Sequence, residues 1–406
     1  MKTAAKVLVD TLVAHGIDRA FCVPGESYLA VMDALHGDPV LDLVTCRHEG
    51  GAAWMALADA KLTGRAGVVL ASRGPGATNA SIAAHSAEQG SFPLVLLLGQ
   101  VSTGKIGKRS PQEINYNKTF SDMAKSVEEV DIPDRIGETI ARAIRIAESG
   151  TPGPVVVSLP TDVLAAESNA ATVSRRKSTT ARPNDGDAAY VADQIAKAER
   201  PVMIVGGRVD SAEARRALLA ASEAWGIPVL PTYVHQDVFP NEHPHYGGEL
   251  GIRPPAGVVA TAQEADLIIA VGTKMGAGMA TMGERIPAAS QRVIHVYPDE
   301  APIGRDFDVD FGIVSDSGAF LEALAAQNAP EMSAARRSWI EKAHKGYTDF
   351  ANSPSRSAED GLDFGHVIEA MKSTVPDDAV ITVDAGSFSS WLHHKYPFKA
   401  TQNLLG

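Results

Sequence analysis

Three apolar runs, each the length of a strand, most constrain what this chain can fold into. They are Ala66–Ser72 (AGVVLAS), Pro93–Leu98 (PLVLLL) and Pro154–Leu159 (PVVVSL). A strand that is apolar along its whole length is typical of a parallel sheet whose two faces are both covered by helices. Helical stretches separate the runs, so the sequence predicts five or six strand–helix repeats. We expect these repeats to form one doubly wound α/β domain over residues 1–167.

The same alternation resumes after a polar segment, residues 168–187, which has no apolar period and predicts a linker. A second α/β domain is expected over residues 188–345. A third begins near residue 355 and contains one helix, Phe364–Ser373, and one strand, Ala379–Val383. One such unit cannot cover both faces of a parallel sheet. Residues 355–406 therefore predict the beginning of an incomplete domain, completed by further chain or by packing on another part of the protein.

Charge and apolar content exclude several classes of protein. The formal net charge of −12 over 406 residues argues against binding to nucleic acid. No apolar run approaches the ~20 residues that a membrane-spanning helix needs. Two cysteines, Cys22 and Cys46, lie in separate strand-like runs and predict buried thiols in a reducing cytoplasm. Four histidines of the central region are scattered without ligand spacing, so we expect no transition-metal site.

Glu49 is the most informative single residue. It follows a strand-like run, Leu41–Cys46, and opens a helical run, Gly51–Thr63. Open α/β sheets bind their ligands at the carboxyl ends of the strands, which is where this carboxylate is expected. A carboxylate at a helix N-terminus is also favourable for purely structural reasons. The residue alone therefore leaves a functional and a structural interpretation open.

Two further segments are expected at the same edge of the sheet. Pro24-Gly25-Glu26 ends the first strand, where Glu26 is either a helix-terminal carboxylate or an acid–base group. The segment Gly74–Asn79 (GPGATN) predicts a glycine-rich turn before a helix. Such a turn binds a phosphate in some proteins, and in others it is a tight connection capped by a residue such as Asn79.

Taken together, these motifs resemble the thiamine-diphosphate enzymes of the acetolactate synthase type. The resemblance rests on Phe21-Cys22-Val23-Pro24-Gly25-Glu26, Arg47-His48-Glu49-Gly50, Ser72-Arg73-Gly74-Pro75-Gly76-Ala77-Thr78-Asn79, Gly99-Gln100-Val101 and Gln112-Glu113-Ile114, in matching order and spacing. The similarity continues through the central region to Val383-Asp384-Ala385-Gly386. It implies that the chain is the front part of such an enzyme, inactive without the remainder.

The resemblance assigns Glu49 the role of holding the pyrimidine N1′ of the cofactor. A carboxylic acid that protonates this remote nitrogen turns the 4′-amino group into an imine, which can take the proton from the thiazolium C2. The cofactor then attacks a keto carbon and acts as an electron sink. The resemblance also places Pro24, Gly25, Gly74, Gly76 and Asn79 along the pyrimidine.

The resemblance has consequences for the partners of the chain as well. It matches Asp384, Gly386 and Ser387 to the first cofactor loop of the diphosphate-binding domain. In the family this loop packs against the glutamate of a partner subunit. The resemblance therefore implies a homodimer or homotetramer with its active site at the subunit interface.

Two positions bear on the substrate. Gln112 matches a glutamine that faces the substrate, but Pro111 stands where a phenylalanine is usual. Glu26 matches an aspartate that serves as the acid–base group of related 2-oxoacid decarboxylases. The implied function is decarboxylation of a 2-oxo acid, or cleavage of an acyloin, with ligation of the product. The alternatives are a decarboxylase or C–C lyase without ligation, and a non-catalytic cofactor-binding or regulatory subunit.

Other family features are missing from the sequence. The family binds Mg²⁺ through a Gly-Asp-Gly motif and a later asparagine, which are expected beyond residue 406. The central domain of acetolactate synthases binds FAD, and Gly206-Gly207-Arg208 matches a part of that site. The arginine that binds the second ketoacid is absent, because the turn in its place reads Thr273–Met279 (TKMGAGM). This turn argues against FAD and against acetolactate itself as the product.

Overall fold

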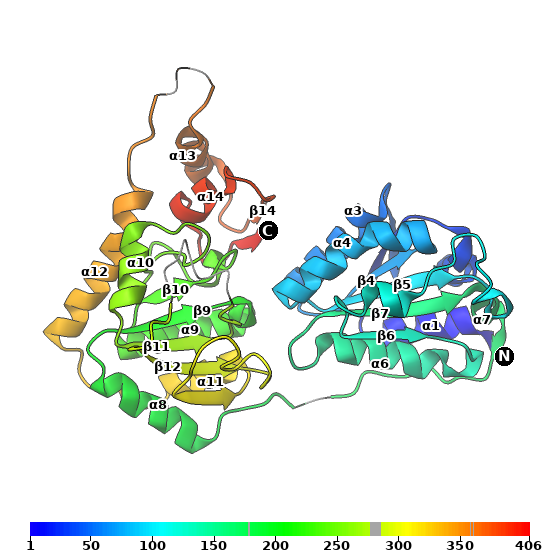
Figure 1. Cartoon of the computed structure of the whole chain (residues 1–406), viewed down its shortest axis with the longest axis horizontal. Coiled ribbons are helices and arrows are strands. Elements are labelled where there is room, and N and C mark those ends of the chain that lie inside the picture. The colour runs from blue at the N-terminus through cyan, green and yellow to red at the C-terminus, as the bar shows by residue number, and fades with distance from the viewer. Residues whose placement is uncertain (178, 277–285, 358, 360) are drawn as a thin grey trace. The chain divides into compact units, whose positions relative to one another are not determined.

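A computed structural model describes residues 1–177, 179–276, 286–357, 359 and 361–406. The chain forms two compact units, Met1–Ser178 and Thr179–Gly406 (Figure 1). Each unit is built around its own parallel sheet with helices on both faces. The expected fold class, consecutive doubly wound α/β domains, is therefore confirmed. Within the part of the chain that the structure describes, no helix is both long enough and apolar enough to cross a membrane.

The first unit contains a six-stranded parallel sheet with the order β3-β2-β4-β5-β7-β6. Its strands are β2 (Arg19–Cys22), β3 (Asp42–Thr45), β4 (Gly67–Ala71), β5 (Leu94–Gln100), β6 (Ser126–Glu129) and β7 (Pro154–Pro160). The three predicted apolar runs are the fully buried strands β4, β5 and β7 at the middle of the sheet. Strand β6 (SVEE) has no apolar run and was not predicted, because an edge strand is only partly buried.

Two separate cores cover the faces of this sheet. Helices α1 (Ala4–Ala14), α2 (Leu29–Leu35) and α6 (Ile136–Glu148) pack on one face. Helices α3 (Glu49–Thr63), α4 (Gly74–Gly90) and α5 (Tyr116–Phe120) pack on the other (Figure 1). Alanines line the contact between α3 and α4, and such small side chains allow two helices to approach closely.

Two of the helices on the second face, α3 and α4, begin earlier than predicted. Helix α3 starts at Glu49, because the Nδ1 atom of His48 accepts a hydrogen bond from the backbone N–H of Gly50 at 3.0 Å and caps the helix. Helix α4 starts at Gly74, so the segment Gly74–Asn79 is a first helical turn rather than the predicted loop. Pro75 is compatible with that turn, because its missing N–H would have no partner there.

The polar segment expected as a linker is mostly held against the two units. Ser168 belongs to strand β8 (Glu167–Ser168), which pairs antiparallel with β1 (Lys2–Thr3). Arg175 forms an ion pair with Glu148 at 2.7 Å in the first unit. At its other end, the segment runs into helix α8 (Asp185–Lys197), which begins with a capping box.

The second unit contains a five-stranded parallel sheet with the order β10-β9-β11-β12-β13. Its strands are β9 (Pro201–Val205), β10 (Val229–Pro231), β11 (Leu267–Val271), β12 (Arg292–Tyr297) and β13 (Phe311–Val314). Helix α9 (Ala212–Trp225) packs against α11 (Ser317–Ala325), and α10 (Ala256–Glu264) packs against α12 (Ala334–Ala351). One continuous hydrophobic core joins these elements.

The C-terminal segment, where we expected a third domain to begin, lies within this second unit. It consists of α13 (Phe364–Thr374), β14 (Val380–Thr382), α14 (Ser389–Lys395) and β15 (Asn403–Leu405). Strands β14 and β15 pair in parallel, and a small apolar cluster that includes Ile368, Leu392 and Phe398 lies beneath them. The segment contacts the central sheet domain, for example through Asn403 and Leu404.

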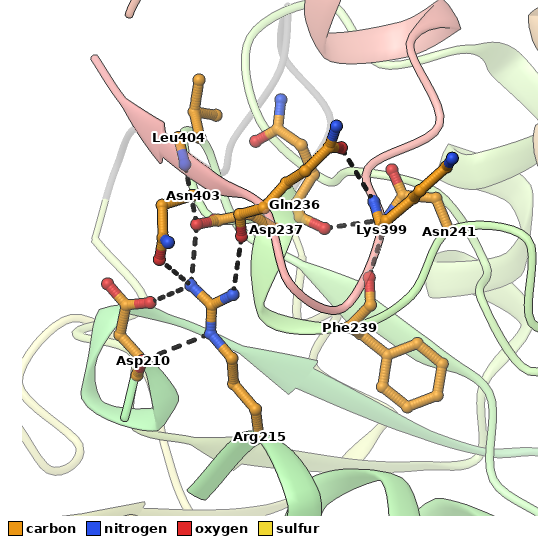
Figure 2. Close-up of polar contacts among 10 residues, drawn as sticks. Asp210, Arg215, Gln236, Asp237, Phe239, Asn241, Lys399, Asn403 and Leu404 are labelled. Atoms are coloured by element: carbon orange, nitrogen blue, oxygen red, sulfur yellow. Dashed lines mark hydrogen bonds and ion pairs between the residues drawn. The ribbon is translucent and has the colours of Figure 1, made fainter. Parts of the chain in front are cut away.

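A buried ion-pair network attaches β15 to the central domain (Figure 2). The guanidinium of Arg215, on α9, contacts Asp237 at 2.8 Å and also bonds Asp210. It donates to the side-chain oxygen of Asn403 at 3.2 Å, while Asp237 accepts from the backbone N–H of Leu404 at 2.9 Å. Two adjacent residues of the C-terminal strand, Asn403 and Leu404, are thus bonded to charged groups of the central domain.

Candidate functional site

The strand order of the first unit predicts a crevice between β2 and β4, at the carboxyl ends of these strands. Strand β3 lies on one side of β2 and β4 on the other, so the connections leave the carboxyl ends of the strands in opposite directions. Such a topological switch point is where open α/β sheets bind ligands. The loops after β2 and β4 touch here, because the hydroxyl oxygens of Ser27 and Ser72 lie 2.9 Å apart.

Gly25 is required by this contact between loops. A Cβ atom on Gly25 would lie 2.4 Å from the Oγ atom of Ser72, which is closer than any stable contact allows. The segment Pro24-Gly25-Glu26 therefore lies at the same edge of the sheet as the start of α4, as the sequence predicts. A glycine at this position lets the two strand ends approach without a side chain between them.

The carboxylate of Glu49 lies between the first turns of α3 and α4. Its Oε2 atom accepts a hydrogen bond from the side-chain amide of Asn79 at 2.9 Å. Its Oε1 atom lies 3.0 Å from the position that a Cβ atom on Gly76 would take. The side chain is half-buried. Two residues of α4 thus orient the carboxylate of Glu49, which belongs to α3, and leave it partly accessible.

Gln112 approaches the same wall through its backbone. Its carbonyl oxygen accepts a hydrogen bond from the N–H of Gly74 at 3.0 Å and lies 3.0 Å from the place of a Cβ atom on Gly74. The residue has a left-handed backbone with φ of 65°, and its side chain is exposed. The structure therefore brings the backbone of Gln112 to the start of α4, and its role toward a substrate stays a prediction.

Glu26 forms an ion pair with Arg73 across the two loops, with 2.5 Å between Oε1 and Nη2. The Arg73 side chain is 16% exposed, whereas that of Glu26 is 75% exposed. Arg73 precedes helix α4 directly. The sequence alone suggested no role for Arg73, although its position next to the glycine-rich segment was a usable signal.

Two buried tyrosines, Tyr28 and Tyr116, belong to the same unit as these residues. Burial raises the pKa of the Tyr28 hydroxyl, and the nearby Cys22 thiol and Glu49 carboxylate add to the shift. The hydroxyl of Tyr116 donates to the backbone oxygen of Gly99 at 2.6 Å. Burial raises the pKa of Tyr116 as well. Both phenols therefore stay neutral at physiological pH and act as hydrogen-bond donors rather than as bases.

Asp384, Gly386 and Ser387 lie in the other unit, in the exposed loop between β14 and α14. Asp384 accepts a hydrogen bond from the N–H of Ala385 at 2.7 Å. The carbonyl oxygen of Gly386 accepts from the hydroxyl of Ser389, also at 2.7 Å. The predicted cofactor residues thus form two groups, one in each unit.

In the central sheet, the glycine pair after β9 faces side chains of the protein itself. A Cβ atom on Gly206 would lie 2.7 Å from the Cβ atom of Thr273, and one on Gly207 would lie 2.7 Å from the imidazole of His235. Packing thus explains both glycines without a ligand. Of the turn Thr273–Met279, residues 277–279 lie outside the described residues. Among the residues that are described, no three His, Cys, Asp or Glu side chains cluster as metal ligands would.

Comparison with known proteins agrees with the two-unit organisation. Residues 2–119 match the family described as thiamine pyrophosphate enzyme, N-terminal TPP binding domain. Residues 188–324 match the thiamine pyrophosphate enzyme central domain. One match lies within each of the two units.

Individual relatives cover almost the whole chain. A probable acetolactate synthase large subunit of Methanocaldococcus jannaschii is 31% identical over 99% of this chain and 70% of its own length. An acetolactate synthase of Mycobacterium bovis is 32% identical over 96% of this chain and 64% of its own length. The large subunit of acetolactate synthase isozyme 3 of Escherichia coli is 30% identical over 98% of this chain and 71% of its own length. The chain thus spans 64% to 71% of the length of these relatives.

These matches confirm the resemblance that the motifs around Glu49 predict, and the chain belongs to the family of thiamine pyrophosphate enzymes, with acetolactate synthase large subunits among its relatives.

Proposed function

We propose that this chain provides the pyrimidine-binding half of a thiamine-diphosphate enzyme that decarboxylates a 2-oxo acid and ligates the product to a second carbonyl. The observation that carries the proposal is the Glu49 carboxylate, oriented by Asn79 at 2.9 Å and faced by Gly76 at the switch point of the sheet. The relatives named as acetolactate synthases support the carboligation. The proposal concerns the complete enzyme, because the chain spans only part of the length of those relatives.

The residues present fit the pyrimidine of the cofactor. A Cβ atom on Gly25, Gly74 or Gly76 would meet protein atoms within 3.0 Å, so packing accounts for these glycines, and the resemblance alone assigns them to the pyrimidine. The ring nitrogen of the pyrimidine needs an acid within hydrogen-bonding reach. Glu49, held at the first residue of α3, supplies that acid.

When bound, thiamine diphosphate supplies the electron sink that lets the carbon–carbon bond beside a keto group break. The residues of this chain do the rest. Glu49 holds and returns a proton at the pyrimidine nitrogen. The amide of Asn79 fixes which oxygen of Glu49 faces that nitrogen, since it occupies the other oxygen. The buried tyrosines and the alanine-rich contact of α3 with α4 keep water from the back of the site.

The lyase alternative would use Glu26 as the acid–base group. Glu26 forms an ion pair with Arg73 at 2.5 Å, and its side chain is 75% exposed. A carboxylate this open to water is not shielded as the acid–base group of such a reaction would need to be. We therefore favour ligation over a lyase that depends on Glu26, and the named relatives do not favour a non-catalytic subunit.

We include self-association in the proposal. Beside Glu49, the outward sides of α3 and α4 carry large exposed apolar residues: Trp54, Met55, Leu62 and Ile82. A second copy of the chain that covered this face would remove these side chains from water and close the site. Light scattering should find dimers or tetramers, and a strictly monomeric complete enzyme would contradict this part of the proposal.

Magnesium and the cytoplasmic location also remain proposals. We assign no residue of this chain to Mg²⁺, which would neutralise the negative charge of the cofactor diphosphate in the complete enzyme. We leave FAD out, because packing accounts for the glycines on which its site would depend. A cytoplasmic location would suit thiols such as Cys22 and Cys46, which are free in the structure.

The decisive experiment replaces the carboxylic acid of Glu49 by an amide in the complete enzyme. Glu49→Gln preserves shape but cannot transfer a proton, so turnover of 2-oxo acids should fall by about 100-fold to 10,000-fold. Glu138→Gln is the matched control. Glu138 is an exposed carboxylate on α6, on the opposite face of the sheet, and it pairs with Arg135 just before that helix. Full turnover in the Glu49 variant would refute the proton-transfer role.

A further inference from the structure

Arg73 occupies a distinctive position at the switch point. It is the last residue before α4, between Ser72 and Gly74, and both neighbours belong to the wall of the crevice. The site of a Cβ atom on Gly76 lies 3.0 Å from the Glu49 carboxylate and 3.3 Å from the Cβ atom of Ser72. Arg73 therefore follows Ser72, whose side chain lies beside the Glu49 carboxylate at Gly76.

The Arg73 guanidinium is held in place on its inner side. The side chain is only 16% exposed, and its Nε atom is buried without a hydrogen-bond partner. Its positive charge is close enough to Tyr116 to oppose part of the effect of burial on the pKa of that phenol. An arginine in such a place is preorganised, but its hydrogen-bonding capacity is not fully used.

The counterion of this arginine is on the outer side and is free to move. Glu26 is 75% exposed and engages a single guanidinium nitrogen. Water and salt weaken an ion pair with one exposed partner, and little free energy is lost when that partner leaves. Another carboxylate of suitable size can therefore take the place of Glu26 on the guanidinium.

The substrate of the proposed reaction brings such a carboxylate. A 2-oxo acid carries a negative charge beside its keto carbon, and Glu26 and Glu49 would repel it from this crevice. A planar guanidinium binds a carboxylate through two parallel hydrogen bonds, which neutralises the charge and fixes the orientation of the keto group.

We propose that Arg73 is the residue that selects a 2-oxo acid by binding its carboxylate, with Glu26 as the resident partner that the substrate displaces. The inference rests on the proposed function, because it takes the crevice to be the reaction site. It gives Glu26 a role in substrate exchange in place of acid–base chemistry. It also supplies a receptor for a carboxylate where the usual arginine of the central domain is missing from the sequence.

The test compares pyruvate with methyl pyruvate, which has the same keto carbon but no negative charge. Binding is measured by calorimetry in the complete enzyme loaded with a cofactor analogue that cannot react, so that turnover does not interfere whether or not Glu49 acts as proposed. Arg73→Met should weaken pyruvate binding by about tenfold to a hundredfold and leave methyl pyruvate binding unchanged. Arg73→Lys should restore part of the loss, because it keeps the charge without the planar fork.

Two further variants complete the test. Glu26→Gln should strengthen pyruvate binding about twofold to tenfold, because it removes a competing carboxylate from the guanidinium. Arg135→Met, which removes an exposed arginine on the opposite face, should change neither ligand. Equal weakening of both ligands by Arg73→Met would overturn the inference, as would unchanged pyruvate binding. Neither result depends on whether Glu49→Gln abolishes turnover, so the proposed function and this inference can fail separately.

Discussion

Two arginines of this protein form similar ion pairs in opposite surroundings. Arg73 pairs with Glu26, which is 75% exposed, and Arg215 pairs with Asp237, which is 0% exposed. The arginines themselves are almost equally covered, at 16% and 12% exposure. The burial of the carboxylate therefore separates a pair that can exchange its partner from a pair that holds the fold together.

The buried pair has several further partners. Burial alone would lower the pKa of the Arg215 guanidinium, but Asp237 and Asp210 outweigh it and the pKa is raised. Arg215 also donates to the backbone oxygen of Gln402 at 3.0 Å and to the side chain of Asn403 at 3.2 Å (Figure 2). A buried charge with this many partners is costly to disturb, because removing it leaves the others desolvated and unpaired.

The largest effect on stability is therefore expected at Arg215. Arg215→Met should lower the free energy of unfolding of the second unit by about 3–5 kcal/mol, because Asp237 would remain buried without its cation. Urea denaturation followed by tryptophan fluorescence measures this loss. The control is Arg216→Met on the same helix, where the side chain is 70% exposed and pairs with Glu213 at 3.3 Å. Equal losses for the two variants would contradict the comparison.

A smaller effect is expected from acid, through His393 on α14. Burial lowers the pKa of this imidazole to about 4, and the neighbouring His394 adds to the shift. The unfolded chain has a pKa of about 6.5 at this residue and so binds the proton first. Stability should be full above pH 6.5 and fall by up to about 3 kcal/mol as the pH drops to 4.

Glu249 opposes this trend. Its carboxyl group is completely buried, 3.2 Å from the imidazole of His394, and burial raises its pKa despite that neighbour. The raised pKa favours folding at acid pH, and this contribution is lost as the pH rises through the folded pKa. Because the lowered pKa of His393 causes the loss of stability in acid, His393→Gln should flatten the acid side of the stability profile. Urea midpoints between pH 4 and 7.5 measure this profile. The exposed His366 is the control, and an equal change in His366→Gln would contradict the assignment.

The smallest effect is expected at Glu26. Glu26→Gln should change the free energy of unfolding by less than about 1 kcal/mol, because the lost ion pair was exposed on one side. The measurement is the same urea denaturation, read on the first unit. A loss as large as that of Arg215→Met would mean that Glu26 is structural, and it would remove the basis for exchange with a substrate.

Much of the architecture was predictable, because a strand that is buried on both faces has an apolar sequence. Strands β4, β5 and β7 are apolar throughout and were identified from that property alone. Edge strand β6 and the short helix α5 leave no such mark and were missed. The start of α4 was placed too late, because glycine and proline are typical of loops but are also compatible with a first helical turn.

The site was predictable in part for a different reason. The carboxyl ends of parallel strands meet at one edge, so the placement of Glu26, Glu49 and the glycine-rich segment at that edge followed from the order of the elements. The hydrogen-bond partner of Glu49 and the ion-pair partner of Glu26 did not follow from that order. Asn79 is 30 positions from Glu49, and Arg73 is 47 positions from Glu26, and no periodicity connects residues so far apart.

By itself, the sequence determined the sheets, the edge at which the candidate site lies, and the family to which the chain belongs. These properties depend on local apolar patterns and on the order of motifs along the chain. Only the tertiary structure decided that the C-terminal segment packs on the central domain and that Arg215 holds it there, whereas Arg73 has an exposed partner. Whether an ion pair is buried depends on neighbours from distant parts of the chain, and the sequence around an arginine does not specify them.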